Sequence, residues 1–217
     1  MRLTIAALFV LFSFTAAAQC FNARDFVLSV GHSGAGVTKF TANDSAGYRT
    51  QHEEGGFNFY LRGEYGLSPW LSVNLSVSLT PLITQTLFDE DATCYIYDAG
   101  PGLGYHIPWK NRWIDLEGDA GIGYTRFFQS DLGEEKIDIK AISVFGDFHP
   151  RVYFTKKQRL GGFLYYRFNL YSGSGEVAKT GFQRRLVDVQ GYTHAFGIGW
   201  FYRFGNWNRP DTDEDPL

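Results

Sequence analysis

The chain lacks any long hydrophobic run once its first residues are set aside. A helical membrane span needs about 20 consecutive apolar residues, and nothing after residue 18 approaches that length. Cysteine is also scarce, because Cys20 and Cys94 are the only two and cannot form a disulfide scaffold. The net charge of −3 is small, so electrostatics give no reason to expect a nucleic-acid partner. These shortages argue against helical membrane proteins, disulfide-rich domains and nucleic-acid-binding proteins.

The first 18 residues have the pattern of a secretory signal peptide. A positive start, Met1-Arg2, precedes an apolar run from residue 5 to residue 14, and small residues follow up to Ala18. This order of regions predicts export and cleavage after Ala18. Lipidation of Cys20 is an alternative, although the preceding Gln19 is bulkier than the residue such sites usually carry.

The rest of the chain divides into one domain and a tail. Residues 19–205 form the expected domain, and residues 206–217 form an acidic, proline-containing segment that we expect to be a disordered periplasmic tail. With Cys20 and Cys94 expected at opposite ends of the domain, we predict no disulfide between them.

Eight segments of the domain alternate apolar and polar residues, most strictly from Leu71 to Leu79. Side chains of a strand point alternately to its two faces, so such segments have one apolar and one polar face. We expect strands near residues 24–36, 56–66, 70–82, 93–106, 113–127, 138–154, 160–171 and 191–204. The longer connections between them are expected at residues 37–55, 83–92, 128–137 and 172–190.

The eight alternating segments and the spacing of their longer connections predict an all-β fold, an eight-stranded antiparallel up-and-down transmembrane β-barrel. An even strand number, short periplasmic turns and longer outer loops are typical of bacterial outer-membrane barrels. The 18% aromatic content also suits a wall that is apolar outside and polar inside. A soluble periplasmic ligand-binding barrel is the alternative, but its wall would have the opposite polarity.

The polar faces of the expected strands carry many charges. A hairpin near Gly133 would place Asp115 opposite Arg151, Glu117 opposite His149 and Asp119 opposite Asp147, within ion-pair reach. The expected interior ion-pair network consists of Arg62, Glu64, Asp115, Glu117, Asp119, Asp147, His149, Arg151, Arg167 and Arg203.

The interior of an eight-stranded barrel is just wide enough for side chains to fill. We therefore expect this network to be a neutralised plug, with a metal or proton site as the alternative; no metal and no cofactor are predicted. Gly100, Gly102 and Gly104 share the inward face of their strand, where missing side chains would leave room for longer neighbours.

The signal peptide, the eight segments and the closing stretch from Gly197 to Phe204 resemble the small outer-membrane barrels of the OmpA/OmpX type. More particularly, they resemble the outer-membrane-protein β-barrel domain proteins common in Bacteroidota. Gly199, Tyr202 and Phe204 match that family's insertion signal, which implies recognition by the barrel assembly machinery. The tail after Phe204 departs from members that end on the aromatic residue.

The resemblance implies a location in the bacterial outer membrane but no single activity. The sequence contains no convincing enzyme motif. In particular, it has no His-x-Ser sequence, whose two side chains would lie on the same face of a strand. We therefore expect a non-enzymatic, monomeric barrel with an envelope or binding role through its outer loops. A narrow conduit for small or apolar solutes and a lipid-modifying enzyme are the alternatives. Outer-membrane lipid is an expected partner, with contacts to lipopolysaccharide phosphates from Arg126, Arg184 and Arg185.

Overall fold

The computed structural model describes residue 21 and residues 23–44, 49–83, 93–107, 113–129, 135–155, 157–179 and 185–205. The expected signal peptide, the acidic tail and Cys20 lie outside these residues, so the predictions made for them stay predictions. Within the described part of the chain, no helix is long and apolar enough to span a membrane.

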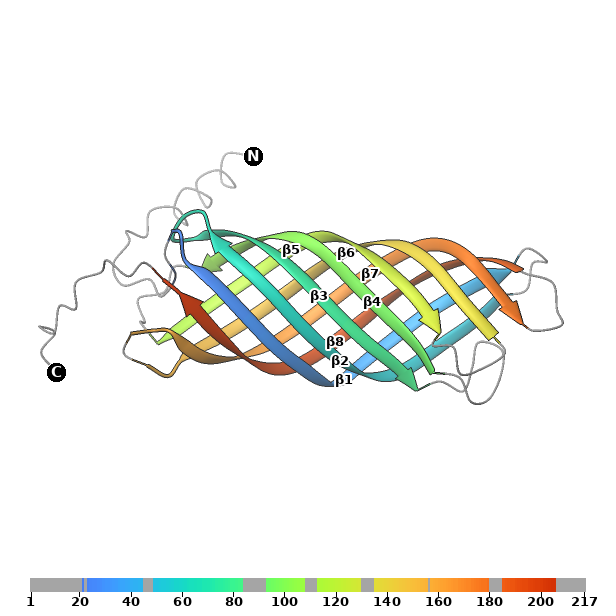
Figure 1. The fold of residues 1–217 in the computed structure, drawn as a ribbon, viewed down its shortest axis with the longest axis horizontal. Coiled ribbons are helices and arrows are strands. Elements are labelled where there is room, and N and C mark those ends of the chain that lie inside the picture. The colour runs from blue at the N-terminus through green and yellow to red at the C-terminus, as the bar shows by residue number, and fades with distance from the viewer. Residues whose placement is uncertain are drawn as a thin grey trace, which may run out of the picture.

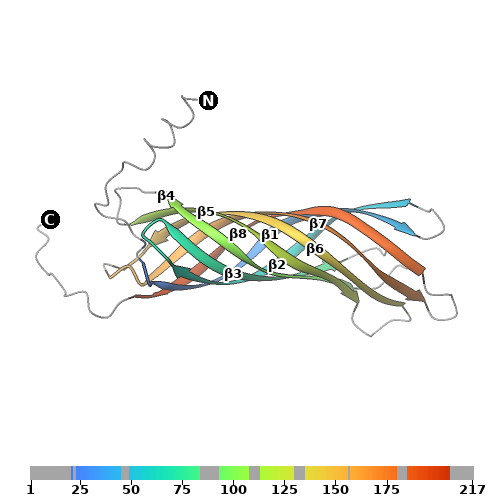
Figure 2. The same ribbon diagram turned by 90° about the horizontal axis from the view of Figure 1, so that it is seen from above.

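Eight antiparallel strands form a closed barrel in which each strand pairs with its neighbours in the chain and β8 pairs with β1. The predicted fold is confirmed, and Figures 1 and 2 show a long cylinder with slanted strands. The strands are β1 (Phe26–Asp44), β2 (Arg49–Gly66), β3 (Leu71–Ile83), β4 (Thr93–Ile107), β5 (Ile114–Gln129), β6 (Glu135–Tyr153), β7 (Leu160–Lys179) and β8 (Arg185–Phe204).

The two ends of the cylinder are distinguished by the strand ends that they hold. At one, which we call the terminal end, β1 begins and β8 finishes, with Phe26 and Phe204 as cross-strand partners. The connections after β2, β4 and β6 also lie there, as the bend from β2 to β3 shows in Figure 1. The opposite end, called the far end, holds the other four connections.

The predicted long loops at the far end are mostly wrong. Residues 37–44 and 49–55 belong to β1 and β2, and residues 172–179 and 185–190 belong to β7 and β8. Gly, Ser and charged residues, which usually indicate loops, are frequent in these segments. Instead they continue the ladder, with pairs such as Ser174 and Asp188, because closure of the barrel supplies each strand with hydrogen-bonding partners on both sides.

The outward face near the terminal end is an apolar belt. On β7 it runs from Leu160 to Leu170, about 33 Å along the strand. A strand tilt of about 40° reduces this to about 25 Å along the axis, the height of the lipid-facing band of outer-membrane barrels. Most outward side chains of the belt are large apolar or aromatic groups with more than a third of their surface exposed, including Phe59, Leu75 and Trp200.

Beyond the belt, the polarity of the wall is reversed. The far-end extension comprises residues 135–140 of β6, 172–179 of β7 and 185–190 of β8. Among its outward residues with described side chains, Leu186 is the apolar exception, and the polar members are Asp138, Lys140, Ser172, Ser174, Glu176, Asp188 and Gln190. Its inward side chains include Ile137, Ile139, Val187 and Val189, all buried. This part of the barrel is therefore polar outside and apolar inside, like a soluble domain.

Candidate functional site

A cluster of ionisable side chains lies in the lumen inside the apolar belt. We call it the central charge cluster, and its members are Arg62, Glu64, His106, Asp115, Glu117, Asp119, His149 and Arg151. They come from β2, β4, β5 and β6, and each lies at an inward position of its strand. All are buried, although lipid-facing residues stand on the same strands one position away. Strict alternation along the strands therefore concentrates the charges in the lumen.

The predicted register between β5 and β6 is confirmed. Asp115 pairs with Arg151, Glu117 with His149, and Asp119 with Asp147. Two carboxylates thus lie directly opposite each other on neighbouring strands, an arrangement that is unfavourable unless cations lie close by.

Two arginines neutralise most of the cluster. Arg62 donates hydrogen bonds to both carboxylate oxygens of Glu117, one of them 2.8 Å long, and one of its terminal nitrogens lies 2.9 Å from Asp119. Nη2 of Arg151 lies 2.5 Å from a carboxylate oxygen of both Glu64 and Glu117. Arg62 also lies 3.1 Å from Glu64, so each guanidinium joins carboxylates from β2 and β5, and Arg151 links β6 to both.

His106 is a member of the cluster that the sequence analysis missed. Its Nε2 lies 2.7 Å from Glu64, and its Nδ1 lies 3.0 Å from Asp115. A ring with a carboxylate at both nitrogens fits the doubly protonated, positively charged form. The Phe21 ring stacks on the His106 ring with 3.7 Å between centroids, so the start of the described chain covers the cluster at the terminal end. The inward parity that His106 shares with Gly104 was the available signal.

Arg167 forms a second ion-pair group, farther from the terminal end. Its Nη2 lies 2.9 Å from Asp98 and its Nη1 3.3 Å from Asp147. The guanidinium carbon also sits 4.3 Å from the centre of the Phe145 ring, a cation–π distance. Asp147 and Arg167 are cross-strand partners on β6 and β7.

A further buried ion pair involves Arg203. It lies at the terminal end, where its Nη2 is 2.6 Å from Asp25. Arg203 is almost the last residue of β8 and reaches the start of β1, and its membership of the predicted interior network stays a prediction.

Glycines on β4 make room for the cluster, as predicted. A Cβ atom added to Gly104 would collide with the Glu117 carboxylate and the Ser72 hydroxyl, and one added to Gly102 would collide with the Asn74 amide. These carboxylate and amide groups therefore occupy the space that β4 side chains would otherwise fill.

Buried acids outnumber buried arginines, so the expected near-balance of charge is wrong. Seven buried acids face four buried arginines among the described residues, and His106 supplies a further cation. The acids are Asp25, Glu64, Asp98, Asp115, Glu117, Asp119 and Asp147, and the arginines are Arg62, Arg151, Arg167 and Arg203. Oδ1 of Asp119 and Oδ1 of Asp147 have no hydrogen-bond partner among the described residues. The excess of negative charge is therefore greatest where these two carboxylates face each other.

One group in the described chain has the spacing of a metal site: Glu64, His106 and Glu117 have ligand atoms within 4.8 Å of one another. Arg62 and Arg151 already contact both of these glutamates. A divalent cation bound there would lie beside two guanidinium groups, so the residues present fit an ion-pair network better than a metal centre.

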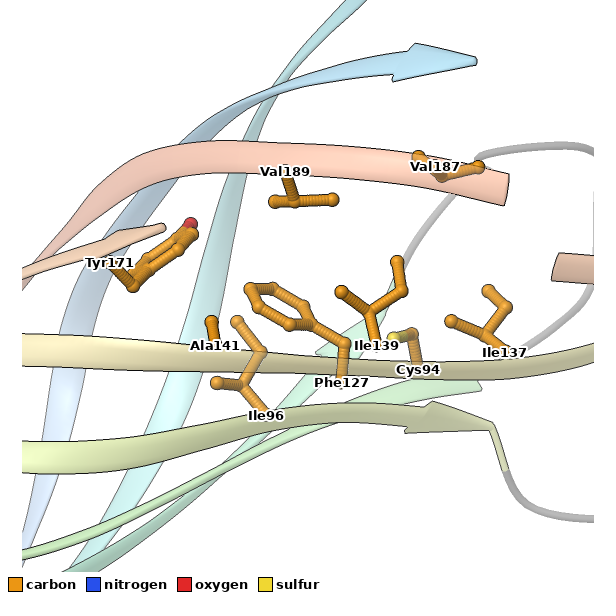
Figure 3. Close-up of a cluster of buried hydrophobic side chains, with 9 residues drawn as sticks. All are labelled: Cys94, Ile96, Phe127, Ile137, Ile139, Ala141, Tyr171, Val187 and Val189. Atoms are coloured by element: carbon orange, nitrogen blue, oxygen red, sulfur yellow. The ribbon is translucent and has the colours of Figure 1, made fainter. Parts of the chain in front are cut away.

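The far half of the lumen is lined by apolar side chains, which the sequence analysis did not predict. This apolar cluster consists of Cys94, Ile96, Phe127, Ile137, Ile139, Ala141, Tyr171, Val187 and Val189. They project toward one another from β4, β5, β6, β7 and β8 (Figure 3). The lumen thus changes from charged to apolar along its axis, at about the height where the outer wall changes in the opposite sense.

The remaining predicted residues lie apart from the lumen network. Arg126 is exposed on β5 and bonds Asp138 over 2.8 Å, and Arg185 is exposed at the start of β8, while Arg184 lies outside the described residues. In the predicted insertion signal, Gly199 points inward, whereas Tyr202 and Phe204 point outward with 41% and 49% of their surface exposed.

No protein-family model and no curated protein matches this chain. Solved structures do match it. The outer membrane protein OprG from Pseudomonas aeruginosa has a TM-score of 0.63 and 16% sequence identity over 87% of this chain and 99% of that one. Neisserial surface protein A has a TM-score of 0.57 and 13% identity over 83% and 97% of the two chains. Outer membrane protein AlkL, solved in lipid bilayers, has a TM-score of 0.53 and 15% identity over 90% and 97%.

At this level of identity the likeness concerns the fold, which is that of small outer-membrane barrels. That fold and the apolar belt together place the chain in a bacterial outer membrane. With an even number of strands, both termini of the barrel lie at the terminal end, which we assign to the periplasm; the far-end extension, beyond the apolar belt, then stands outside the bilayer.

Proposed function

We propose that this protein is a closed, non-enzymatic outer-membrane barrel that acts through the part standing above the bilayer. The observation that carries the proposal is that two successive layers of buried side chains line the lumen, the central charge cluster and the apolar cluster. An ion crossing the barrel would have to displace paired guanidinium groups and then pass an apolar zone, and both steps are costly.

The histidine contacts support a role without catalysis. Nε2 of His149 lies 3.2 Å from the Tyr60 hydroxyl, and the ring nitrogens of His106 face carboxylates. On the outer surface, His194 accepts or donates a 2.6 Å hydrogen bond with Tyr166. None of these histidines contacts a serine hydroxyl among the described residues, so they do not form the histidine–serine pair of a serine hydrolase.

Conductance recording tests the closed lumen. The full mature chain, refolded and inserted into planar lipid bilayers, should give no discrete current steps. The charge-balanced double variant E117S/R151S, which shortens two large side chains of the central charge cluster, should give steps or open-channel noise. A general porin in the same bilayers shows that the assay detects a pore. Discrete steps from the wild-type barrel would contradict the proposal.

Photo-crosslinking in intact cells tests the binding role. A photoreactive residue at Asp188, in the far-end extension, should give a discrete adduct with a partner. The same residue at Ile198, in the apolar belt, should contact only lipid and is the matched control. Identical patterns at the two positions would argue against recognition by the extension.

A conduit for small apolar solutes is the second candidate, and the apolar cluster favours it. Such a solute could enter the far half of the lumen through contacts with Ile139 and Val189, although the central charge cluster stands in its way toward the periplasm. Uptake of a small apolar fluorophore into proteoliposomes would separate the two functions. Uptake above that of protein-free liposomes, blocked by the bulky substitution Ala141→Trp, would support the conduit and contradict the closed barrel.

A further inference from the structure

Two cations face each other on the outer surface of the barrel. Arg126 on β5 and Lys140 on β6 are directly opposed in the strand register. Both point away from the lumen, and the Arg126 side chain is 45% exposed. Directly opposed like charges destabilise a pair of strands unless an anion lies between them.

The two cations stand at the upper edge of the apolar belt. The next outward pair toward the periplasm is Tyr124 and Ile142, with 42% and 72% of their surface exposed. Tyr97 on β4 is the other cross-strand partner of Arg126. Successive outward residues are about 7 Å apart along a strand, so the charges sit about one such step above Tyr124 and Ile142 and one step below the stacked rings of Tyr95 and Phe128. This is the level of lipid headgroups.

The described neighbours satisfy this pair only in part. Asp138 accepts a 2.8 Å hydrogen bond from Nε of Arg126, and the guanidinium lies 5.7 Å from the centre of the Phe128 ring. The terminal nitrogens of Arg126 and the ammonium of Lys140 make no ion pair with any residue that the structure describes. Asp138 is the carboxylate that contacts the pair, while Glu176 lies opposite Asp138 on β7, so the terminal nitrogens of Arg126 and the ammonium of Lys140 remain available to an anion.

We propose that Arg126 and Lys140 together bind the phosphate group of an outer-leaflet lipid. A guanidinium fork offers two parallel donors to phosphate oxygens, and an ammonium one strand away adds a second positive charge from the other side. The apolar surface directly below, with Ile142 and Val144, accommodates the acyl chains of the same molecule. This surface selects a lipid phosphate over free phosphate in solution.

Lys140 lies at the membrane edge of the far-end extension, whereas Arg185, the other described arginine predicted to contact lipopolysaccharide, lies at its outer edge. Arg185 lies seven residues beyond Tyr192 along β8. That distance is about 18 Å along the axis at the strand tilt of such barrels, which places Arg185 above the headgroups. Lys140, which the sequence analysis did not single out, takes its place beside Arg126. Arg185 is therefore a matched control, an exposed arginine outside the site.

Lipid retention tests the proposal on the full mature barrel. The barrel is exchanged into nanodiscs containing lipid A or chemically dephosphorylated lipid A, extracted mildly, and weighed with its bound lipid by native mass spectrometry. Wild type and R185A should retain lipid A, with apparent affinity at least about tenfold higher than for the dephosphorylated form. R126Q/K140Q should lose that preference, and a heat-shift gel confirms that the variant is folded.

Three results would overturn the proposal. They are retention of lipid A by the double variant at the wild-type level, equal binding of dephosphorylated lipid A, and loss of the preference for lipid A in millimolar inorganic phosphate. The last result would show a site for free phosphate rather than for a lipid. The test reads lipid binding only, so its outcome is independent of whether the lumen conducts.

Discussion

Replacing Arg167 by methionine should destabilise the barrel more than the same change at Arg151. Arg167 is 3% exposed, and it is the only cation that contacts Asp147 or Asp98 among the described residues. Methionine keeps an unbranched stem beside Phe145 but removes the charge. The variant therefore leaves two buried acids without a cation, although hydroxyls of Thr125 and Ser143 still bond Asp98.

The two arginines differ in the partners that their acids keep. Removing one member of a buried ion pair costs about 3–5 kcal/mol of folding stability, because the other charge stays buried and unpaired. We expect this cost for Arg167→Met. In Arg151→Met, Glu64 and Glu117 keep Arg62, and Asp115 keeps His106. That variant should cost about 1–3 kcal/mol, the price of unsatisfied hydrogen-bonding groups.

Urea titration of the barrel folded in phospholipid vesicles measures these differences, with the folded fraction read from heat-shifted mobility on a gel. Asp147→Asn is the second variant of the cycle, because it removes one negative charge from a lumen in which buried acids outnumber buried cations. Alone it should change stability by less than about 1 kcal/mol. Combined with Arg167→Met it should recover part of the loss, as a double-mutant cycle detects. An Arg167→Met barrel as stable as wild type, or no recovery in the double variant, would refute the ion-pair argument.

Three further predictions concern the wall. Leu75→Arg, in the middle of the belt, should lower the free energy of unfolding by about 2–4 kcal/mol in the same titration. Ser174→Arg, above the bilayer, should change it by less than about 0.5 kcal/mol. Equal changes in the two variants would mean that the belt is misplaced. Gly104→Ala should cost about 1–3 kcal/mol because its methyl group meets a carboxylate of the central charge cluster, and Gly118→Ala, which has open space, is the neutral control. Phe204→Ala should lower the amount of assembled barrel in outer-membrane fractions without reducing export, and unchanged assembly would remove this residue from the insertion signal.

The sequence predicted the terminal half of the barrel well because two signals coincide there. Alternation with period two marks the strands, and the outward positions are consistently apolar. Parity alone then assigns inward positions, so the pairing of Asp115 with Arg151 follows once the hairpin between β5 and β6 is centred. The cross-strand pair Asp147 and Arg167 follows in the same way.

The far-end extension could not be predicted by the same reasoning. Its strands still alternate, but polar residues occupy the outward positions and apolar residues the inward ones. A prediction that requires an apolar outward face, as in a lipid-facing wall, therefore assigns these segments to loops. Lys140 and Ser174 are examples, since they continue the outward parity of Ile142 and Leu170. The apolar cluster was missed for the same reason. Long-range contacts such as those of Arg62 with Glu117 also depend on which strands face each other across the lumen, which local patterns do not encode.

The two halves of the barrel are therefore stabilised by different forces. Inside the bilayer, lipid surrounds the belt, so packing the wall against lipid yields little hydrophobic stabilisation. The lumen there is held by ion pairs from Arg62, Arg151 and Arg167. Above the bilayer, water surrounds the wall, and burial of side chains such as Phe127 and Val189 again drives folding. Because this extension has its own core, it can hold the outer rim about 20 Å from the belt without lipid support. That separation is what a surface recognising a partner needs and what a simple membrane pore does not.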